Sequence, residues 1–247
     1  MAEEFVLGAQ LSTAHSAPGA LEPERVLAAI GEATAIAPLD ILIVGAGATP
    51  ALYQALTAPR SRPAPQVYLW YDLLSDYPDL EPSDLVVNCQ GDSCAGWGGW
   101  AEQGSDVRET FRFACPNKPG VRAKTLRALE RLLEAYDFAG VLLDKLRYPS
   151  PANGLADMLT CFCPECRRAA SAQGLNLDMV EQALLEPAAS TGGPPGAVIP
   201  PGAPWLSALL GTQPALAHFV RFRADTISEL VAAAAGVVAG LGKALAL

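Results

Sequence analysis

The sequence predicts an α/β fold built on a parallel sheet, and three observations support this prediction. Segments with strand and helix patterns alternate four times along the chain. The strand segments are apolar throughout instead of alternating, which is typical of a parallel sheet covered by helices. With 247 residues, 51% of them hydrophobic, the chain can bury a sizeable core without disulfides.

The first two strand–helix units follow one another closely. Residues 5–11 and 40–44 are apolar runs that predict buried strands. Residues 23–36 predict a helix that begins near its proline, and residues 49–57 predict a shorter helix. In the shorter helix, Thr49 is a residue type typical of an N-cap, and a proline follows it in the first turn.

The third and fourth units are separated by a long segment. Residues 66–72 and 138–143 predict the third and fourth strands, and residues 121–136 predict a helix with leucines on one face. The loop at 73–119 is long enough to indicate a functional role. After the fourth strand we expect a Pro/Gly-rich insertion at 187–204 and helices at 167–173, 177–185, 205–210 and 216–241.

Four strand–helix units point to one of two architectures. A right-handed series of such units forms either a doubly wound sheet or a (β/α)8 barrel of the TIM type. A barrel needs eight strands and takes ~250 residues, whereas this chain spends much of its length on two long loops. We therefore expect residues 1–247 to form a single TIM-barrel-type domain that is the N-terminal half of a barrel, ending before strand five. A complete four-stranded α/β domain is the alternative.

Composition and charge exclude several classes of function. The net charge is −9 and the chain has no clustered run of Lys and Arg, which argues against a nucleic-acid partner. The N-terminus lacks the pattern of a secretory signal, so we expect a cytoplasmic protein. Residues 230–247 contain one charge, but they are rich in Ala and Gly and have helical apolar spacing. We expect them to form a helix on a soluble core rather than a membrane segment.

The cysteines predict a metal site. Six cysteines without a secretory signal fit thiols or metal ligands better than disulfides. Cys161, Cys163 and Cys166 form a Cys-x-Cys-x-x-Cys turn, and Cys115 in a separate turn can complete a tetrahedral zinc site. Because four thiolates leave no open coordination position, we expect the zinc to be structural and to fix the loop after strand four.

Other readings of the cysteines stay open. The four can be independent reduced thiols, and Cys89 and Cys94, five positions apart in a Gly-rich loop, can replace Cys115 as ligands or be free. An iron–sulfur cluster is a further alternative, although the spacing matches neither ferredoxin pattern.

Polar residues at the ends of the predicted strands define a candidate site, because this edge of a parallel sheet faces the binding crevice. Asp144 ranks first, since it follows apolar residues and since Lys145 and Arg147 nearby would keep it ionised by lowering its pKa. An ionised carboxylate suits a nucleophile, an electrostatic stabiliser or a general base. The alternative is that Asp144 only pairs with a basic neighbour to end the strand. The same rule collects Gln10, His15, Gly45, Gly47, Tyr71, Asp72 and Tyr148.

Several of these candidates have alternative readings. Asp72 can bind a ligand or cap a turn, and Trp97 and Trp100 can stack on sugar rings or anchor their loop. The glycines after strand two lack the third glycine of a dinucleotide-binding turn. His15 and His218 are too few and too far apart to build a catalytic triad.

Three segments resemble a glycoside-hydrolase-like barrel family. They are residues 113–119, residues 137–149 and residues 219–227. The second contains Gly-Val-Leu-Leu-Asp-Lys-Leu-Arg-Tyr-Pro, which is similar to a recurring strand-four phrase of that family. The resemblance implies a barrel that binds carbohydrate at the C-terminal ends of its strands. It implies Asp144 as catalytic carboxylate oriented by Lys145 and Arg147, with sugar contacts from Gln10, Tyr71, Asp72, Tyr148, Trp97 and Trp100.

The cysteines are similar to those of the family 42 β-galactosidases, in which one upstream Cys and a Cys-x-Cys-x-x-Cys after strand four bind structural zinc. The matching positions here are Cys115, Cys161, Cys163 and Cys166. That family ends strand four with Asn-Glu, the Glu being the acid/base, whereas this chain has Asp144-Lys145. The acid/base role is therefore not carried over.

The expected function is that of a glycosidase-like protein. Glycosidases need two carboxylates, and in barrels the partner of Asp144 usually comes from a later strand. If the chain ends at Leu247, it must recruit a partner chain, and so form a homo-oligomer, or lack hydrolase activity. The alternatives are a non-catalytic carbohydrate-binding or scaffold protein of the same fold, and a metal or redox protein in which the cysteines are the working residues.

Overall fold

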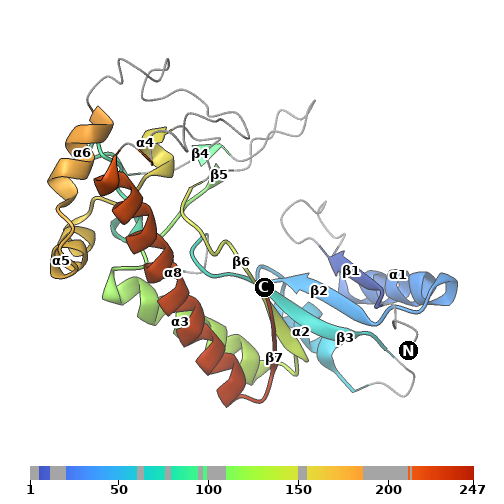
Figure 1. Ribbon diagram of the computed structural model, residues 1–247. Helices are drawn as coiled ribbons and strands as arrows, with labels where there is room; N and C mark the ends of the chain where they lie inside the picture. Colours follow the sequence, from blue (N-terminus) through green and yellow to red (C-terminus); the bar gives the residue numbers. More distant parts are fainter. Residues whose placement is uncertain are drawn as a thin grey trace, which may run out of the picture. The chain divides into compact units, whose positions relative to one another are not determined.

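The computed structural model describes residues 6–11, 21–59, 64–75, 79–93, 97–98, 110–149, 155–185, 211 and 213–247. The chain forms two compact units, each described here by itself (Figure 1). The sheet unit comprises Met1–Leu73, Leu126–Asp144 and Ala233–Leu247. The cysteine unit comprises Leu74–Thr125 and Lys145–Ala232.

The sheet unit contains a five-stranded parallel sheet, which confirms the predicted α/β class. Its order, β1-β2-β3-β6-β7, follows the order of the strands along the chain. The strands are β1 (Gly8–Leu11), β2 (Ile41–Gly45), β3 (Gln66–Asp72), β6 (Gly140–Asp144) and β7 (Ala244–Ala246). All four strand pairs in this sheet are parallel.

The fifth strand is a correction to the sequence analysis, which expected the chain to stop before it. β7 pairs with β6 in the register Gly140↔Ala244. Its three residues, Ala-Leu-Ala, contain no β-branched or aromatic side chain and directly follow a long helix. A segment this short, without the residue types that favour strands, gives no strand signal that the sequence analysis could detect.

The helices begin where proline and capping residues predicted. α1 (Pro23–Ile36) and α2 (Pro50–Thr57) both have proline in the first turn, and the Thr49 hydroxyl accepts a hydrogen bond from the backbone N–H of Leu52 at 3.2 Å. α3 (Pro119–Ala135) and α8 (Pro214–Gly240) correspond to the predicted patterns at 121–136 and 216–241. The predicted helix at 205–210 and insertion at 187–204 lie outside the described residues.

The two faces of the sheet differ in burial. On one face, Leu42, Val44, Val67, Leu69 and Val141 are buried. They share the core of the sheet unit with α2 side chains, among which the ring of Tyr53 packs 5.4 Å from that of Phe138. The residues between them, such as Ile43, Trp70 and Leu142, are only half-buried. The strands are therefore apolar on both faces, and among the described residues one face is more deeply buried than the other.

The cysteine unit has its own core, built around aromatic and cysteine side chains. Short helices α4 (Leu155–Met158), α5 (Pro164–Ala172) and α6 (Leu177–Leu185) surround it, and α8 contributes Phe219 and Phe222. The segment before α3 contributes the 3-10 turn η1 (Pro82–Asp84) and the antiparallel pair β4 (Trp97–Gly98) and β5 (Thr110–Phe111).

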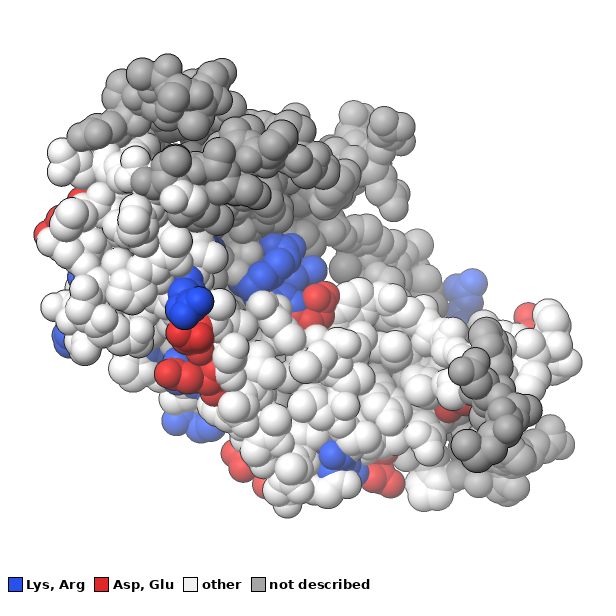
Figure 2. Space-filling model, in the orientation of Figure 1, with Lys and Arg blue, Asp and Glu red and all other residues white. Residues whose placement is uncertain are grey.

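The surface carries charges of both signs. On the face drawn in Figure 2, basic side chains lie beside acidic ones, with wide uncharged areas between them. None of the helices in the described part of the chain, α8 included, combines the length and the hydropathy needed to cross a membrane.

Candidate metal centre and candidate sheet-edge site

Four cysteines converge in the cysteine unit. The Sγ atoms of Cys115, Cys161, Cys163 and Cys166 all lie within 4.8 Å of one another, and all four side chains are buried. The Sγ of Cys115 is 3.6 Å from that of Cys163 and 3.4 Å from that of Cys166. Four sulfurs at ~2.3 Å from a tetrahedral zinc would be ~3.8 Å apart. The donor set and its spacing therefore fit a metal ion that accepts thiolate ligands.

The local sequence explains how three ligands reach one point. Cys163 is the N-cap of α5, Pro164 occupies the first turn, and Cys166 is three residues beyond the cap. The Cys-x-x-Cys spacing therefore places two sulfurs around the amino end of one helix. The positive end of the helix dipole favours thiolates there.

The fourth ligand comes from a separate turn that hydrogen bonds hold in place. The backbone N–H of Cys115 donates to the carbonyl of Asp84 at 2.8 Å. The Asp84 carboxylate in turn accepts from Lys124 Nζ at 2.9 Å and from the backbone N–H of Glu81 at 3.0 Å. This network connects the position of Cys115 to η1 and α3.

Neutral donors surround the sulfurs. The backbone N–H of Val87 lies 3.2 Å from Cys161 Sγ, and Asn117 Nδ2 lies 3.3 Å from Cys166 Sγ. The chain beside Cys161 is further fixed by the Phe162 N–H, which donates to the Val87 carbonyl at 2.9 Å. Such outer contacts orient ligands and partly neutralise the charge on the sulfurs.

The four thiols share their protons unequally. Burial opposes ionisation of Cys161, but hydrogen bonds from the other three thiols and from Val87 outweigh it and hold its pKa well below the ordinary value. A hydrogen bond with Cys115 is the largest cause that lowers the pKa of Cys163, to about 7. Hydrogen bonds to the other three thiols raise the pKa of Cys115. A bound cation would displace the protons that remain.

The alternative ligands have separate outcomes. Cys89 is buried in the same core, but it is not among the four sulfurs that converge. Burial is the main cause that raises its pKa, with Glu181 and Asp157 adding to the effect. Cys94 lies outside the described residues.

A second candidate site lies at the carboxyl edge of the parallel sheet. Asp72 ends β3 and Asp144 ends β6, and the two are register partners, so their side chains are on the same face. Trp70 shares that face and donates from Nε1 to Asp144 Oδ2 at 3.0 Å. All three side chains are half-buried. The edge therefore presents two carboxylates on adjacent strands, one of them fixed by an indole N–H.

Two predicted sugar contacts are corrected by burial. Tyr71 is completely buried, because strand alternation turns it to the face opposite Trp70 and Asp72. Tyr148 is 6% exposed and belongs to the core of the cysteine unit. Neither side chain offers surface to a sugar in this structure. For Tyr71, the apolar pattern of the strand could not separate one face from the other. Tyr148 lies beyond the end of β6, and its burial depends on packing within the cysteine unit.

The remaining predicted residues are distributed as follows. Gln10 is exposed in β1. Lys145 has a left-handed φ of 53°, and the Arg147 guanidinium packs 4.9 Å from the centroid of the Phe113 ring. Both belong to the cysteine unit, and their predicted orientation of Asp144 stays a prediction. Only the backbone of Trp97 is described, in β4, and Trp100 and His15 lie outside the described residues.

Sequence reasoning missed Trp70. Its position two residues before Asp72 places both side chains on one face of β3, because strand side chains alternate. That spacing was visible in the sequence and could have identified it as a neighbour of the site.

Comparison with known proteins finds only distant likenesses. No protein-family model matches the sequence, and no curated protein is similar to it at a significant level. Among solved structures, α-L-fucosidase isoenzyme 2 from Paenibacillus thiaminolyticus is 13% identical over 90% of this chain, with a TM-score of 0.45. The PgaB (BpsB) glycoside hydrolase domain from Bordetella bronchiseptica is 16% identical over 91% of this chain, with a TM-score of 0.41. The chain spans 30% of the fucosidase and 61% of the PgaB domain.

Proposed function

We propose that the protein is glycoside-hydrolase-like and acts on a carbohydrate at the carboxyl edge of its parallel sheet. The observation that carries this proposal is the position of Asp144, which ends β6 beside Asp72 and accepts the hydrogen bond from Trp70. Catalytic carboxylates of parallel β/α folds lie at this edge. The resemblance of residues 137–149 to strand four of a glycoside-hydrolase-like family supports the same assignment.

Two carboxylates on adjacent strands suit glycoside hydrolysis. Neighbouring strands are ~4.8 Å apart, and the carboxyl groups of retaining glycosidases are ~5–5.5 Å apart. In the proposed mechanism, Asp144 attacks the anomeric carbon or stabilises its positive charge, and the Trp70 N–H fixes its orientation. As the bond from the anomeric carbon to the leaving oxygen breaks, Asp72 gives its proton to that oxygen. Asp72 later takes a proton from the water that attacks the anomeric carbon and releases the sugar. This pairing provides a second carboxylate within the chain, a role that the sequence analysis sought in a later strand.

The metal has a structural role in this proposal. Four thiolates would saturate a zinc ion and leave no position for substrate or water. The residues that would hold it come from the Cys115 turn and from the amino end of α5. A bound zinc would supply the crosslink between these two segments, and the carboxylates would carry the chemistry.

Asp144→Asn tests the catalytic proposal. Turnover of a panel of aryl glycosides should be lost, because a neutral amide can be neither the nucleophile nor the anionic stabiliser that the mechanism assigns to Asp144. Binding of the best substrate, measured by calorimetry, should remain. Asp137→Asn is the matched control, because Asp137 is an exposed carboxylate in the same unit, paired with Lys243 at 2.8 Å. Equal turnover in the Asp144 and Asp137 variants would contradict the proposal.

A non-catalytic carbohydrate-binding or scaffold protein is the second candidate. The half-buried aromatic side chains of Tyr68 and Trp70 on the open face of the sheet favour it, since aromatic faces supply contact area for sugars. It predicts binding to a glycan array without turnover of any glycoside by the wild-type protein. Trp70→Ala should then abolish binding, whereas Asp144→Asn should have no turnover to remove.

A further inference from the structure

Arg223 is a buried cation. Arg223 is 9% exposed. Within the described part of the chain, its guanidinium has no carboxylate partner. One terminal nitrogen of the guanidinium donates to the carbonyl of Met158 at 2.5 Å, whereas Nε has no hydrogen-bond partner. The guanidinium carbon lies 4.3 Å from the centroid of the Tyr148 ring and 5.6 Å from that of Phe219. These contacts hold the side chain but do not neutralise it.

A guanidinium in this environment stays charged. Burial lowers the pKa of Arg223 to about 10, which is still far above neutrality, while Tyr148 and, after it, Cys161 and Cys166 act in the opposite direction. An unpaired buried charge is costly unless an opposite charge is near. A negative group inside the cysteine unit would offset this cost.

The cysteine cluster is the negative group at hand. Phe162, between two of the ligands in sequence, packs against Phe219 of α8 with 5.3 Å between ring centroids. Phe219 lies one turn of α8 before Arg223, and Tyr148 lies under the guanidinium. Burial is the largest cause that raises the pKa of Tyr148, and charge on Cys166 and Cys115 adds to it. Both Tyr148 and Arg223 are thus within electrostatic range of the sulfurs.

A cluster with a bound divalent cation would carry net negative charge. Four thiolates and one divalent cation carry a net charge of two minus, inside a core with little water. The contacts from Val87 and Asn117 are neutral donors, so they disperse this charge without cancelling it. One buried guanidinium that packs on Tyr148 and Phe219, which share a core with the four cysteines, would offset half of it.

We propose that Arg223 is the buried counter-charge of a metal–thiolate centre, and that it couples metal binding to the docking of α8. This inference rests on the metal centre of the proposed function. Arg223 is a positioning residue that stabilises the ionised ligands. Four neutral thiols would leave the guanidinium unpaired, so Arg223 also argues against the reading of the cysteines as independent reduced thiols.

The proposal predicts an effect whose size depends on the metal. In the loaded protein, Arg223→Met removes the counter-charge, and metal affinity should fall by ~10–100-fold, as for other outer-shell partners. In the metal-free protein the cluster keeps some of its protons and has less negative charge to offset, so the same change should lower the melting temperature by less than it does in the loaded protein. Arg223→Lys keeps the charge and should retain most of the affinity.

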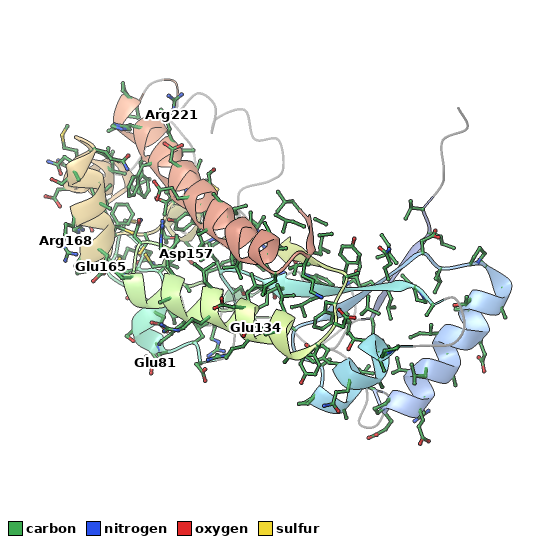
Figure 3. The ribbon with its side chains drawn as sticks, turned by 90° about the horizontal axis from the view of Figure 1, so that it is seen from below. Glu81, Glu134, Asp157, Glu165, Arg168 and Arg221 are labelled. Carbon is green, nitrogen blue, oxygen red and sulfur yellow. The ribbon has the colours of Figure 1, made fainter. Side chains whose placement is uncertain are left out.

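Arg221→Met is the matched control. Arg221 is on the same helix, two positions away, but it is exposed (Figure 3). Affinity is measured by titrating the reduced full chain with Co²⁺, whose d–d bands report tetrahedral thiolate coordination, and by zinc competition with a chromophoric chelator. Thermal unfolding with and without metal completes the set.

The outcomes distinguish failure of the counter-charge role of Arg223 from failure of the metal centre itself. Weaker binding in Arg223→Met, with wild-type binding in Arg221→Met, supports the counter-charge. Equal affinity in the two variants overturns it and leaves the metal centre intact. If Arg223→Met cannot be isolated with metal, Arg223→Lys decides, because a loss of metal affinity of about tenfold or more in the variant that keeps the charge overturns the proposal. A wild-type chain that binds no Co²⁺ overturns the metal centre as well.

Discussion

The cluster of four cysteines and the sheet edge bring reactive side chains together in opposite ways. Three of the four sulfurs come from positions 161, 163 and 166, and all four are buried. The sheet edge joins residues as far apart as Trp70 and Asp144, 74 positions along the chain, and its side chains are half-buried. A local motif produces a closed, dry cluster suited to a structural ion. Alignment of distant strands produces an open edge suited to a ligand.

The segment at 137–149, which resembles strand four of the glycoside-hydrolase-like family, contributes to both regions. Asp144 belongs to the sheet unit and lies on its partly exposed face. Tyr148, four positions later, is buried in the cysteine unit beneath Arg223. One short segment of sequence therefore serves the candidate catalytic edge at its beginning and the core of the metal centre at its end.

The largest effect is expected from the ligands themselves. Cys166→Ser should abolish stoichiometric metal binding and lower the melting temperature of the cysteine unit, since structural zinc contributes ~10–16 kcal/mol of apparent binding energy. Metal analysis and calorimetric melting are the measurements. Cys89→Ser is the control, because Cys89 is equally buried but outside the cluster. Retention of one metal per chain in Cys166→Ser would contradict the site.

At the sheet edge, Asp72→Asn should reduce turnover by ~10²–10⁴-fold. Because the two carboxylates act as a pair in the proposed mechanism, the double variant with Asp144→Asn should lose little more than either single variant. The measurement is kcat/KM on the best aryl glycoside. If the losses in kcat/KM of the two single variants instead multiply in the double variant, and if Asp72→Asn changes KM alone, Asp72 contributes to substrate binding, as the sequence analysis expected.

Gly140→Ala tests the fifth strand. A Cβ at Gly140 would lie 2.6 Å from the Ala244 carbonyl oxygen of β7 and 2.4 Å from Tyr68 Cε1. Overpacking of this kind should cost ~1–3 kcal/mol in urea unfolding. Gly8→Ala is the control, because its Cβ would meet neighbours at 3.8 Å or more. Equal stability of the two variants would mean that β7 does not pack against β6 as described.

Asp84→Asn should have the smallest effect, about 1–2 kcal/mol, because it weakens hydrogen bonds to a charged carboxylate. Burial raises the pKa of Asp84, but the hydrogen bonds from Lys124 and Glu81 and the charges of Lys124 and Lys118 outweigh it, so the net pKa is lowered. A lowered pKa contributes stability that is present above the ordinary carboxyl range and lost as pH falls through the folded-state value.

Urea unfolding of wild type and Asp84→Asn at neutral and acidic pH measures this effect. The difference between the two proteins should be full at pH 7 and should shrink in acid. Glu81→Gln provides the comparison at an exposed partner of Lys124 and should cost less. A difference that is constant with pH would show that the Asp84 carboxylate does not contribute through its charge.

Prediction from sequence succeeded where the signal was local. The third strand was predicted at 66–72, the bounds that β3 has, and the Thr49 cap and the four converging cysteines were identified from their spacing. Each of these depends on residues within a few positions of one another, apart from Cys115.

Prediction failed where the outcome depends on packing between distant segments. Ala244–Ala246 becomes a strand only because β6 offers an edge, through Gly140, that a backbone can approach closely. Tyr71 was assigned to sugar because an apolar strand does not reveal which of its faces is open. Tyr148 was assigned because it follows the fourth strand, but it packs in the core of the cysteine unit. The Arg223 guanidinium had no signal at all, since its role comes from the contact of α8 with Tyr148 and Met158.

The most direct test of the central claim is X-ray absorption at the metal edge, on reduced full-length protein with its metal content measured in parallel. We expect one zinc per chain, bound by four sulfurs at ~2.3 Å with no nitrogen or oxygen ligand. Substoichiometric metal together with four freely titrating thiols, or a first shell containing nitrogen or oxygen, would contradict it.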